Sequence, residues 1–593
     1  MSLVVVALVK QVPKGDHSGR LDADGRLERD GAVAEMNPWC RRAVAQAVRL
    51  AGVTGGRSTA ITMGPPAAVD VLREALAWGV DDAVQLSDPA LAGSDCLVTA
   101  RALAATVRLL DDPPDLILVG NSSVDGSTGA VGAMLAELLG LPFTGPVLAV
   151  DPVDGRLRTT VQHDAGTESV TIDLPAVVAV AERSCDPAKA PVDTWPAPEA
   201  VRRLSTTDLS EAEGSWGMAA SPTKVAQVHP APLTRNPVIF RGHPESQVTR
   251  ALAELTTRGC FNPHGPPSAA PHPNAVVTPA SPRAEVQVVA LVGGGSVEGT
   301  RALLGAAAAL AAEAGGEVVA VRTAAAADDL AQWGADSVVV LDGDEPRSVA
   351  RALAGWMGER RPWAVLGAAL PWDREVLARL AVSSGAGLMS DLVSLSTKDG
   401  RLSGLKPSGG GTLAEIVSHG TPQIATLRTG LLPLSAPRAD RPLEERVLHV
   451  EPDPAITRTQ RRTGNDGDAL DRAEVVIGVG RGVSPEKYDE LEPVRALLNA
   501  ELAATRKVTD QGWLPHGRQI GITGRSVAPR IYLAVGLSGN LNHLAGASRA
   551  GTVVAINTDP AAEIFAHCDV GLVADWQEVM PYLVDGLRSC VNG

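Results

Sequence analysis

The 593-residue sequence is poor in cysteine, in aromatic residues and in long apolar runs. Its six cysteines are scattered without a CxxC pair, which excludes a disulfide scaffold and a zinc site of the usual spacing. No window reaches the roughly 18 uninterrupted apolar residues of a membrane helix, so we do not expect an integral membrane protein. The net charge of −15 argues against nucleic acid as a partner. We expect a cytoplasmic protein with reduced cysteines and no metal site.

Short runs of Val, Ile and Leu alternate with Ala-rich amphipathic stretches along nearly the whole chain. Buried parallel strands form continuous apolar runs, and helices cover both faces of their sheet. The N-terminal run has its charges after it rather than before it, so we interpret it as a first strand and not as a signal peptide. The predicted fold class is α/β, with three doubly wound parallel-sheet domains, two of which repeat one nucleotide-binding-like fold.

An internal repeat supports that division. Residues 76–88, LAWGVDDAVQLSD, are echoed at 330–342 by LAQWGADSVVVLD. Chance likeness between Ala-rich α/β segments is the alternative. Segments rich in Pro, Ser and polar residues separate the units and predict linkers. The predicted boundaries are a first unit at 1–259, a linker at 260–283, a second unit at 284–451, a linker at 452–464 and a third unit at 465–593.

Three strand ends of the third unit carry glycine and polar residues. They are Gly480-Arg481-Gly482, the turn from Gly536 after the strand at 531–535, and Asn557. The carboxyl ends of strands form the ligand crevice of a doubly wound sheet. Glycine lets backbone approach a ligand, and arginine suits phosphate. The spacing is GxGxG instead of GxGxxG, and no acid/base pair is evident, which disfavours a nicotinamide-dependent dehydrogenase. Without GxSxG or HExxH, we expect no hydrolytic site.

The residues after these strands carry a family resemblance. TGRSVAP (523–529), AVGLSG (534–539), HLAG (543–546), VAINTDP (554–560) and IFAHCDVGLVAD (564–575) occur in order. This region resembles the FAD-binding domain of the electron-transfer flavoprotein α subunit. MNPWCRRAVAQAVRL (36–50) and LILVGNSSVDGSTGAVG (116–132) resemble the β subunit of the same family. The resemblance implies a β-like half followed by an α-like half in one chain.

The resemblance also implies that the third unit binds FAD. It places Arg506 beside the flavin ring, Thr523 at flavin N5 and His543 at the C2 carbonyl edge, as the three catalytic residues. A hydrogen-bond donor or cation at that edge would stabilise negative charge on the ring. Ile522 and Asn542 each replace a glutamine of the family. The implied FAD-binding residues are Arg481, Thr505, Arg506, Ile520, Gly521, Ile522, Thr523, Ser538, Gly539, Asn540, Leu541, Asn542, His543, Asn557, Asp575 and Trp576.

A second nucleotide site in the first unit is implied in the same way. It holds AMP in ordinary members of the family and a second FAD in electron-bifurcating members. Ala130 replaces the glutamine of the family, so an empty site is a third alternative. Backbone N–H groups and hydroxyls of the loop could hold an anion. The implied positions are Leu8, Asn37, Pro38, Trp39, Cys40, Met63, Ser122, Ser123, Val124, Asp125, Gly126, Ser127, Thr128, Gly129, Ala130, Val131, Gly132 and Ala133.

The resemblance implies an electron carrier without substrate turnover of its own. A flavin dehydrogenase, similar to acyl-CoA dehydrogenase or of another kind, would be the electron donor, and a quinone-oxidoreductase-like protein the acceptor. Residues 182–195 match the loop that docks partners in the family, with Val192 near its protruding leucine. The alternatives are a bifurcating two-FAD flavoprotein that uses NADH and a nucleotide-binding protein that has lost its redox role.

Overall fold

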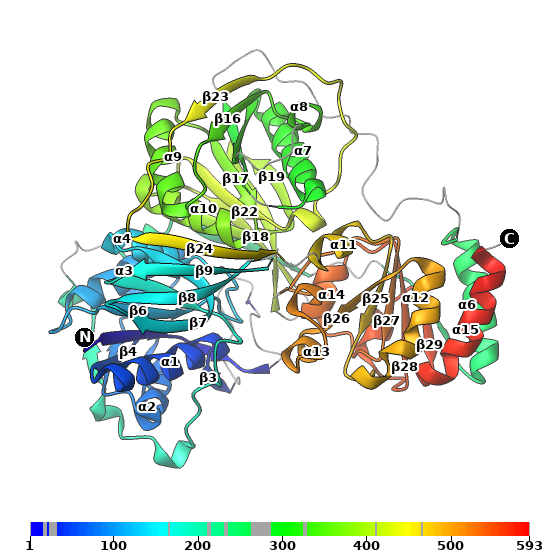
Figure 1. The fold of residues 1–593 in the computed structure, drawn as a ribbon, viewed down its shortest axis with the longest axis horizontal. Helices are drawn as coiled ribbons and strands as arrows, with labels where there is room; N and C mark the ends of the chain where they lie inside the picture. Colours follow the sequence, from blue (N-terminus) through cyan, green and yellow to red (C-terminus); the bar gives the residue numbers. More distant parts are fainter. Residues whose placement is uncertain are drawn as a thin grey trace.

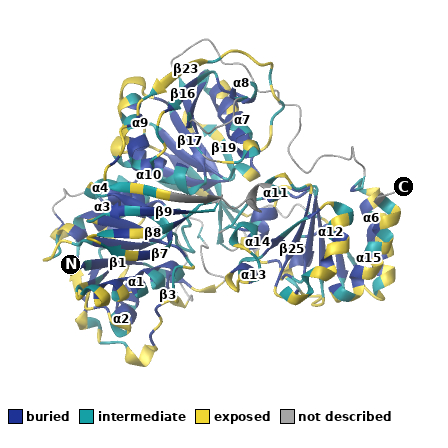
Figure 2. Cartoon of the chain, viewed as in Figure 1, coloured by how far each residue is buried: buried dark blue, intermediate teal, exposed yellow. Residues whose placement is uncertain are grey.

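Apolar strands form three separate sheets, each the centre of one lobe (Figure 1). The computed structural model describes residues 2–15, 21–22, 33–163, 166–209, 215–230, 235–261, 286–293, 295–323, 329–409, 412–463, 466–522 and 524–591. In each lobe the buried residues follow the central strands, and the exposed residues lie mainly on outer helices and loops (Figure 2). The predicted α/β fold with several parallel sheets is confirmed.

The first lobe contains a ten-stranded sheet whose parallel core ends in an antiparallel extension. Strands β8, β9 and β24 pair antiparallel, and the other strands pair in parallel. In sheet order the strands are β11 (Arg202–Leu204), β5 (Asp82–Leu86), β4 (Arg57–Met63), β1 (Val4–Val9), β6 (Leu116–Gly120), β10 (Ala176–Val180), β7 (Phe143–Val153), β8 (Arg156–His163), β9 (Gly166–Asp173) and β24 (Ile456–Thr463). Its helices are α1 (Pro38–Thr54), α2 (Val69–Trp78), α3 (Cys96–Arg108), α4 (Val131–Leu139) and α5 (Gly217–Ala220), and β2 (Gln11–Pro13) pairs with β3 (Ala34–Met36).

The second lobe contains an all-parallel sheet and a small antiparallel sheet. In order the parallel strands are β18 (Leu388–Leu392), β22 (Gln423–Leu427), β17 (Ala364–Ala368), β14 (Gln287–Val292), β15 (Glu317–Thr323), β16 (Ser337–Leu341) and β23 (Glu444–Leu448). The antiparallel sheet is β12 (Thr223–Pro230), β21 (Thr412–Ser418), β20 (Arg401–Ser408) and β19 (Ser394–Lys398). The helices are α7 (Val297–Ala314), α8 (Leu330–Trp333), α9 (Pro346–Arg360) and α10 (Pro371–Ser384).

The third lobe contains a six-stranded parallel sheet. In order the strands are β13 (Val238–Phe240), β29 (Val570–Val573), β28 (Thr552–Asn557), β27 (Ile531–Val535), β25 (Val475–Val479) and β26 (Glu501–Ala504). The helices are α6 (Pro244–Thr257), α11 (Asp466–Arg472), α12 (Glu492–Leu498), α13 (Arg506–Asp510), α14 (Leu541–Leu544) and α15 (Trp576–Val591).

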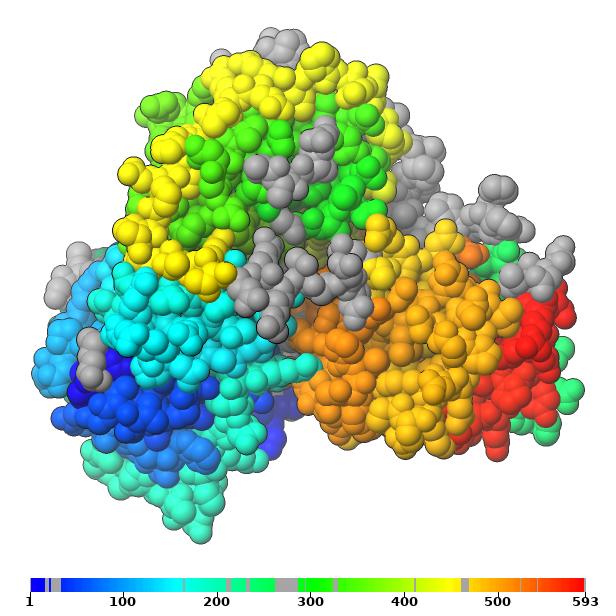
Figure 3. Space-filling model, in the orientation of Figure 1, coloured from blue at the N-terminus to red at the C-terminus, as the bar shows by residue number. Residues whose placement is uncertain are grey.

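The predicted first unit, 1–259, does not stay together in one lobe. Its strand β12 pairs with β21 of the second lobe, and its strand β13 pairs with β29 of the third. Helix α6 packs along α15, far from the rest of the first lobe (Figures 1 and 3). The apolar faces of these short elements cannot be buried alone, so they complete the sheets of other lobes.

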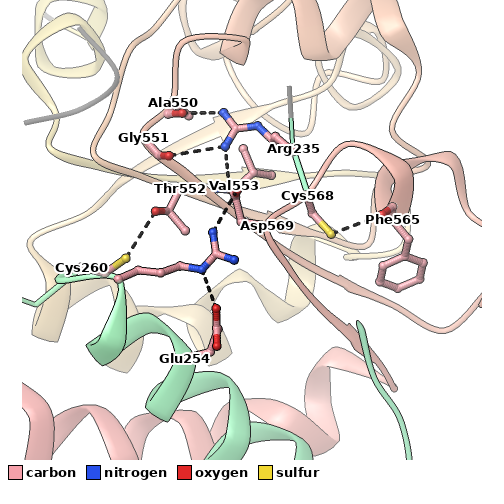
Figure 4. A network of polar contacts seen from close by, with 11 residues as sticks. Arg235, Glu254, Cys260, Ala550, Gly551, Thr552, Val553, Phe565, Cys568 and Asp569 are labelled. Carbon is pink, nitrogen blue, oxygen red and sulfur yellow. Dashed lines mark hydrogen bonds and ion pairs between the residues drawn. The ribbon is translucent and has the colours of Figure 1, made fainter. Parts of the chain in front are cut away.

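An ion-pair network fastens this arm (residues 235–260) to the third lobe (Figure 4). The buried Asp569 carboxylate pairs with Arg235 on one oxygen and, at 3.2 Å, with Arg258 on the other. Arg258 also pairs with Glu254 at 2.8 Å. One buried carboxylate thus holds two arginines that come from the other half of the sequence.

The predicted linker 452–464 also differs from the structure, because residues 456–463 form strand β24. This strand pairs antiparallel with β9 and takes the edge of the first sheet. Threonine and arginine in ITRTQRRT suit an edge strand, where β-branched and charged side chains are tolerated. Most of the predicted linker 260–283 lies outside the described residues.

Helices α4 and α10 join the first two lobes through one continuous core. Arg379 on α10 is fully buried and pairs with Glu137 of α4 at 2.8 Å and with Glu375 at 3.0 Å. Burial raises the pKa of Glu375 to about 7, although Arg379 opposes the shift. The first two lobes are therefore held together by apolar packing around a buried charge cluster.

Candidate functional site

The third lobe brings the ends of three neighbouring strands to one edge of its sheet. Strands β28, β27 and β25 are adjacent and parallel, so their carboxyl ends lie side by side. The Gly482 N–H donates to the Gly536 carbonyl at 3.0 Å, which packs the turn after β25 on the turn after β27. A Cβ on Gly480 would lie 2.2 Å from that carbonyl oxygen. These glycines therefore let two turns touch, in addition to any approach of a ligand.

The turn after β27 presents hydroxyl and amide side chains at this edge. Ser538, Asn540 and Asn542 are exposed. The side-chain oxygen of Asn540 accepts the Asn542 N–H at 2.9 Å and so shapes the start of the single-turn helix α14. Gly539 has φ of +87°, and a Cβ there would lie 2.2 Å from the backbone nitrogen of Ile564. Only glycine fits this position, because any Cβ would clash with the backbone of Ile564.

His543 follows in α14 and is buried. Its Nδ1 lies 3.0 Å from the Ile520 carbonyl oxygen, and its Nε2 lies 2.6 Å from the hydroxyl of Tyr532. Burial lowers the pKa of His543 to about 4, more than the Ile520 carbonyl raises it. His543 is therefore a neutral imidazole at pH 7 in this structure, and not a cation.

Arg506 begins α13 and contacts the first lobe. Its guanidinium pairs with Glu182 and lies over the Trp39 indole, 5.2 Å from the ring centroid. Thr505 precedes it at the N-cap position of α13, without a capping hydrogen bond from its side chain. This contact unites an arginine of the predicted FAD site, the first residue of the predicted docking loop, and a residue of the predicted second nucleotide site.

Two other predicted FAD-site residues hold backbone in place. The Asn557 amide donates to the Leu537 carbonyl at 2.8 Å. The Asp575 carboxylate accepts the Gln577 N–H at 2.9 Å at the start of α15. Both residues therefore shape the loops that border the strand ends, whatever else they bind.

The remaining predicted FAD-site residues lie around the same edge. Arg481 is exposed directly after β25. The Trp576 indole N–H donates to the Gly482 carbonyl at 3.1 Å. Leu541 starts α14, and Thr523 lies outside the described residues.

Two residues that sequence reasoning missed contact this site. Arg428 of the second lobe donates to the carbonyls of Gly521, at 3.4 Å, and Ile522. Tyr532 bonds to His543 as described above. The sequence did contain a signal for Tyr532, because it places a phenol within a strand predicted to be buried. A buried hydroxyl needs a hydrogen-bond partner, so a polar neighbour could have been expected. Arg428 follows an apolar strand, but nothing in the sequence reveals its partners in another lobe.

Side chains of the first lobe brace the loop of the predicted second nucleotide site. The buried Asn37 amide donates to the Ser122 carbonyl at 2.8 Å and accepts the Val124 N–H at 3.1 Å. Lys10 pairs with Asp125 at 2.7 Å. Burial opposes ionisation of Asp125, but Lys10 and nearby hydrogen bonds outweigh it, so the pKa of this carboxyl is lowered.

The rest of that loop packs between the first two lobes. Ser127 and Gly129 both have positive φ, and a Cβ on Gly129 would lie 3.1 Å from Arg374 of α10. Ala130, at the position of the glutamine, is buried. Of the other predicted positions, Leu8 and Met63 lie in strands β1 and β4, Pro38, Trp39 and Cys40 start α1, Ser123, Gly126 and Thr128 lie in the loop, and Val131, Gly132 and Ala133 start α4.

Parallel sheets with polar groups at their strand ends are typical of nucleotide-binding proteins. Comparison with known protein families identifies the family within this broad class. The electron transfer flavoprotein domain matches twice, at residues 24–202 and 286–453, which confirms the internal repeat. The electron transfer flavoprotein FAD-binding domain matches residues 469–548. The chain belongs to the electron transfer flavoprotein family.

Three curated relatives each align with less than half of the chain. The electron transfer flavoprotein subunit alpha of Mycobacterium leprae is 33% identical over 273 residues, which are 44% of this chain and 84% of the relative. The corresponding subunit of Clostridium acetobutylicum is 31% identical over 49% of this chain and 92% of its own length. Protein FixB of Salmonella paratyphi A is 34% identical over 43% of this chain and 84% of its own length.

The described part of the chain holds no helix long and apolar enough to cross a membrane. Within the same residues, no group of three or more His, Cys, Asp or Glu side chains is placed to hold a metal ion. All six cysteines are free thiols.

Proposed function

We propose that the third lobe binds one FAD and that the chain carries electrons from a flavin dehydrogenase to a quinone-oxidoreductase-like acceptor. One observation carries the proposal. The matched FAD-binding domain presents exposed Ser538, Asn540 and Asn542 where three parallel strands end together. Bound FAD would supply one- and two-electron redox chemistry.

The residues present fit a flavin dinucleotide. Hydroxyl and amide side chains suit the hydroxyls of a ribityl chain, and the exposed Arg481 guanidinium suits phosphate oxygens. Asn557 and Asp575 border the same edge, where the resemblance places the adenosine end. His543 lies within this edge as a neutral ring whose two nitrogens are hydrogen-bonded to Ile520 and Tyr532, so it would adjoin the flavin without adding charge.

Arg506 links ligand binding to the position of the third lobe. In this structure it contacts Glu182 and Trp39 of the first lobe. For Arg506 to serve a flavin ring instead, that contact has to loosen. We therefore propose that the third lobe swivels between a first-lobe contact and a partner contact, about the segments that connect it to the other lobes.

We propose that the first lobe corresponds to the β subunit of the family, and that the other two lobes correspond to its α subunit. The two matches of one family domain support this, as do the strands that the first half adds to both other lobes. A fused chain would keep these contacts at high effective concentration.

We propose residues 182–195 as the docking loop for the electron donor. Val192 lies in a short 3-10 turn and is 72% exposed, which is unusual for a large apolar side chain. Glu182, at the start of the same loop, pairs with Arg506. A donor similar to acyl-CoA dehydrogenase that covers Val192 would thus contact the loop whose first residue pairs with the third lobe.

For the second nucleotide site we propose AMP as the occupant, with a second FAD and an empty site as the alternatives. The loop at 122–133 is already braced by Asn37 and by the Lys10–Asp125 pair. The loop backbone is half-buried, and its N–H groups would be the donors to a phosphate.

Release and quantification of bound nucleotides tests both proposals. The purified chain is reconstituted with FAD, denatured, and its FAD and AMP are measured by chromatography. One FAD with one AMP is expected. Two FAD would favour bifurcation with NADH, and one FAD without AMP would mean an empty first-lobe site. Absence of FAD after reconstitution would refute the electron-carrier function.

A further inference from the structure

Tyr532 and His543 form a buried hydrogen-bonded pair at the proposed flavin edge. Tyr532 lies within β27 and is fully buried. Its hydroxyl oxygen is 2.6 Å from His543 Nε2, and the two rings are tilted by 46°. At this distance one of the two groups has to donate a hydrogen bond to the other, because two acceptors or two donors would repel.

The partners of His543 determine where the protons are. A carbonyl oxygen only accepts, so the Ile520 carbonyl 3.0 Å from Nδ1 requires Nδ1 to carry hydrogen. In a neutral imidazole Nε2 is then the acceptor, and the Tyr532 hydroxyl donates to it. Burial raises the pKa of the Tyr532 phenol, so this hydroxyl keeps its proton.

The Tyr532 hydroxyl is packed against the neighbouring strand. It lies against Gly478 of the neighbouring strand β25, where a Cβ would come within 1.8 Å of the hydroxyl oxygen. Among the described residues, His543 is its hydrogen-bond partner. If Nε2 took up a proton, Tyr532 would have to accept instead, and its own hydrogen would be left buried without an acceptor.

Two arginines lie in or reach the loop that carries Ile520, and the lowered pKa of His543 comes from burial and not from their charge. The loop that carries Ile520 contains Arg525, which pairs with Asp471 at 3.0 Å. From the second lobe, Arg428 reaches the same loop and pairs with Asp391 at 3.4 Å. Both arginines have the same sign as a protonated histidine, and their carboxylates are engaged by the arginines.

We propose that Tyr532 is a positioning residue that holds His543 as the neutral Nδ1–H tautomer, so that the flavin edge is faced by an uncharged imidazole during electron transfer. The effect on the flavin rests on the proposed FAD site, whereas the Tyr532–His543 hydrogen bond does not depend on it. Tyr532 would act through His543 and would set how strongly the electron affinity of the bound flavin depends on pH.

Nitrogen-15 NMR of the His543 ring in the full-length chain without FAD tests the geometry. The signal is assigned by its loss in His543→Gln. In the unmodified protein we expect the Nδ1–H tautomer and a titration midpoint near the value of about 4 given by burial. A ring that carries hydrogen on Nε2, or that titrates above pH 6, would overturn the proposal. This measurement needs no variant of Tyr532 to fold.

Tyr532→Phe removes the hydroxyl and keeps the ring. Nε2 then loses its donor and can take up a proton, so we expect the protonated fraction of His543 at pH 6 to rise at least tenfold. Tyr488→Phe is the matched control, because the Tyr488 hydroxyl is buried in the same lobe without a hydrogen-bond partner among the described residues. An unchanged titration in Tyr532→Phe, or an equal shift in both variants, would contradict the proposal.

The FAD-loaded proteins give a second readout. The midpoint potential of bound FAD is measured between pH 5 and pH 8. We expect an additional inflection in Tyr532→Phe that is absent from the unmodified protein and from Tyr488→Phe. Identical curves would overturn the role of Tyr532 in setting the potential. If none of the proteins bound FAD, the proposed function would fail, while the NMR result would still decide the geometry.

Discussion

Two strand-end sites in this chain, the first-lobe loop at 122–133 and the third-lobe edge at 536–543, use the same topology in different ways. In the first lobe, Asn37 and the Lys10–Asp125 pair bind the loop from within. In the third lobe, Ser538, Asn540 and Asn542 are exposed at the edge. Polar groups that hydrogen-bond within the protein stabilise a loop with or without a ligand. Exposed polar groups remain available to bind a ligand.

The two regions also differ in what packs against them. The first-lobe loop lies against the second lobe, with Arg374 of α10 against Gly129. The third lobe takes β13 and α6 from the first half of the sequence and anchors them on Asp569. Both lobes thus take a segment from the other half of the sequence: the edge strand β24 in the first lobe, and a strand with a helix, β13 and α6, in the third.

The largest expected effect comes from Asp569→Asn. Two arginines of the arm would lose their buried counter-charge, so we expect unfolding of the third lobe to become easier by about 3–5 kcal/mol. Denaturant unfolding followed by the fluorescence of bound FAD measures this. Asp82→Asn is the control, because it breaks an exposed pair with Arg57 and should cost less than about 1 kcal/mol. Equal effects would mean that the arm is not essential to the third lobe.

Alanine in place of a loop glycine compares the two sites directly. Gly539→Ala places a Cβ 2.2 Å from backbone at a positive φ, so we expect a loss of about 2–4 kcal/mol and of most bound FAD. Gly129→Ala meets only the flexible Arg374 side chain at 3.1 Å and a carbonyl at 3.3 Å, so about 1–2 kcal/mol is expected, with FAD retained. FAD content and urea midpoints test the ranking, which would be wrong if Gly129→Ala lost more FAD.

Asp125→Asn tests whether the first-lobe loop is braced from within. We expect about 1–3 kcal/mol of destabilisation at pH 7, with unchanged FAD content. Because the folded pKa of Asp125 is lowered, its contribution is present above the unfolded pKa and is lost as pH falls through the folded one. The difference between variant and parent should therefore shrink on acidification. Urea midpoints from pH 7 to pH 3 check this, and a difference that grows would contradict it.

The smallest effect on stability is expected for Val192→Ala in the proposed docking loop. Val192 is exposed, so the free energy of unfolding should change by less than about 0.5 kcal/mol. The rate at which a donor dehydrogenase reduces the bound flavin should fall, mainly through a weaker apparent affinity. Val33→Ala is the control, because that valine is also exposed but lies outside the loop. Equal reduction rates in both variants would argue against docking at 182–195.

Much of the fold could be predicted from local patterns. Continuous apolar runs such as 531–535 became buried strands, and the echo of 76–88 at 330–342 marked a repeated domain. The placement of Ser538, Asn540 and Asn542 at a strand edge followed from topology. By contrast, the exchange of β13 and β24 between lobes was missed, because short polar-flanked strands have no local signal for their partner.

The sequence by itself determined the α/β class, the repeat, the family and the set of residues at the strand ends, because hydrophobic period and ordered motifs are local properties of the chain. Only the tertiary structure decided that His543 is neutral beside Tyr532, that Arg506 contacts Glu182, and that an arm of the first half completes the third lobe. Protonation and pairing depend on burial and on groups that are distant in sequence, and the packed fold alone brings those groups together.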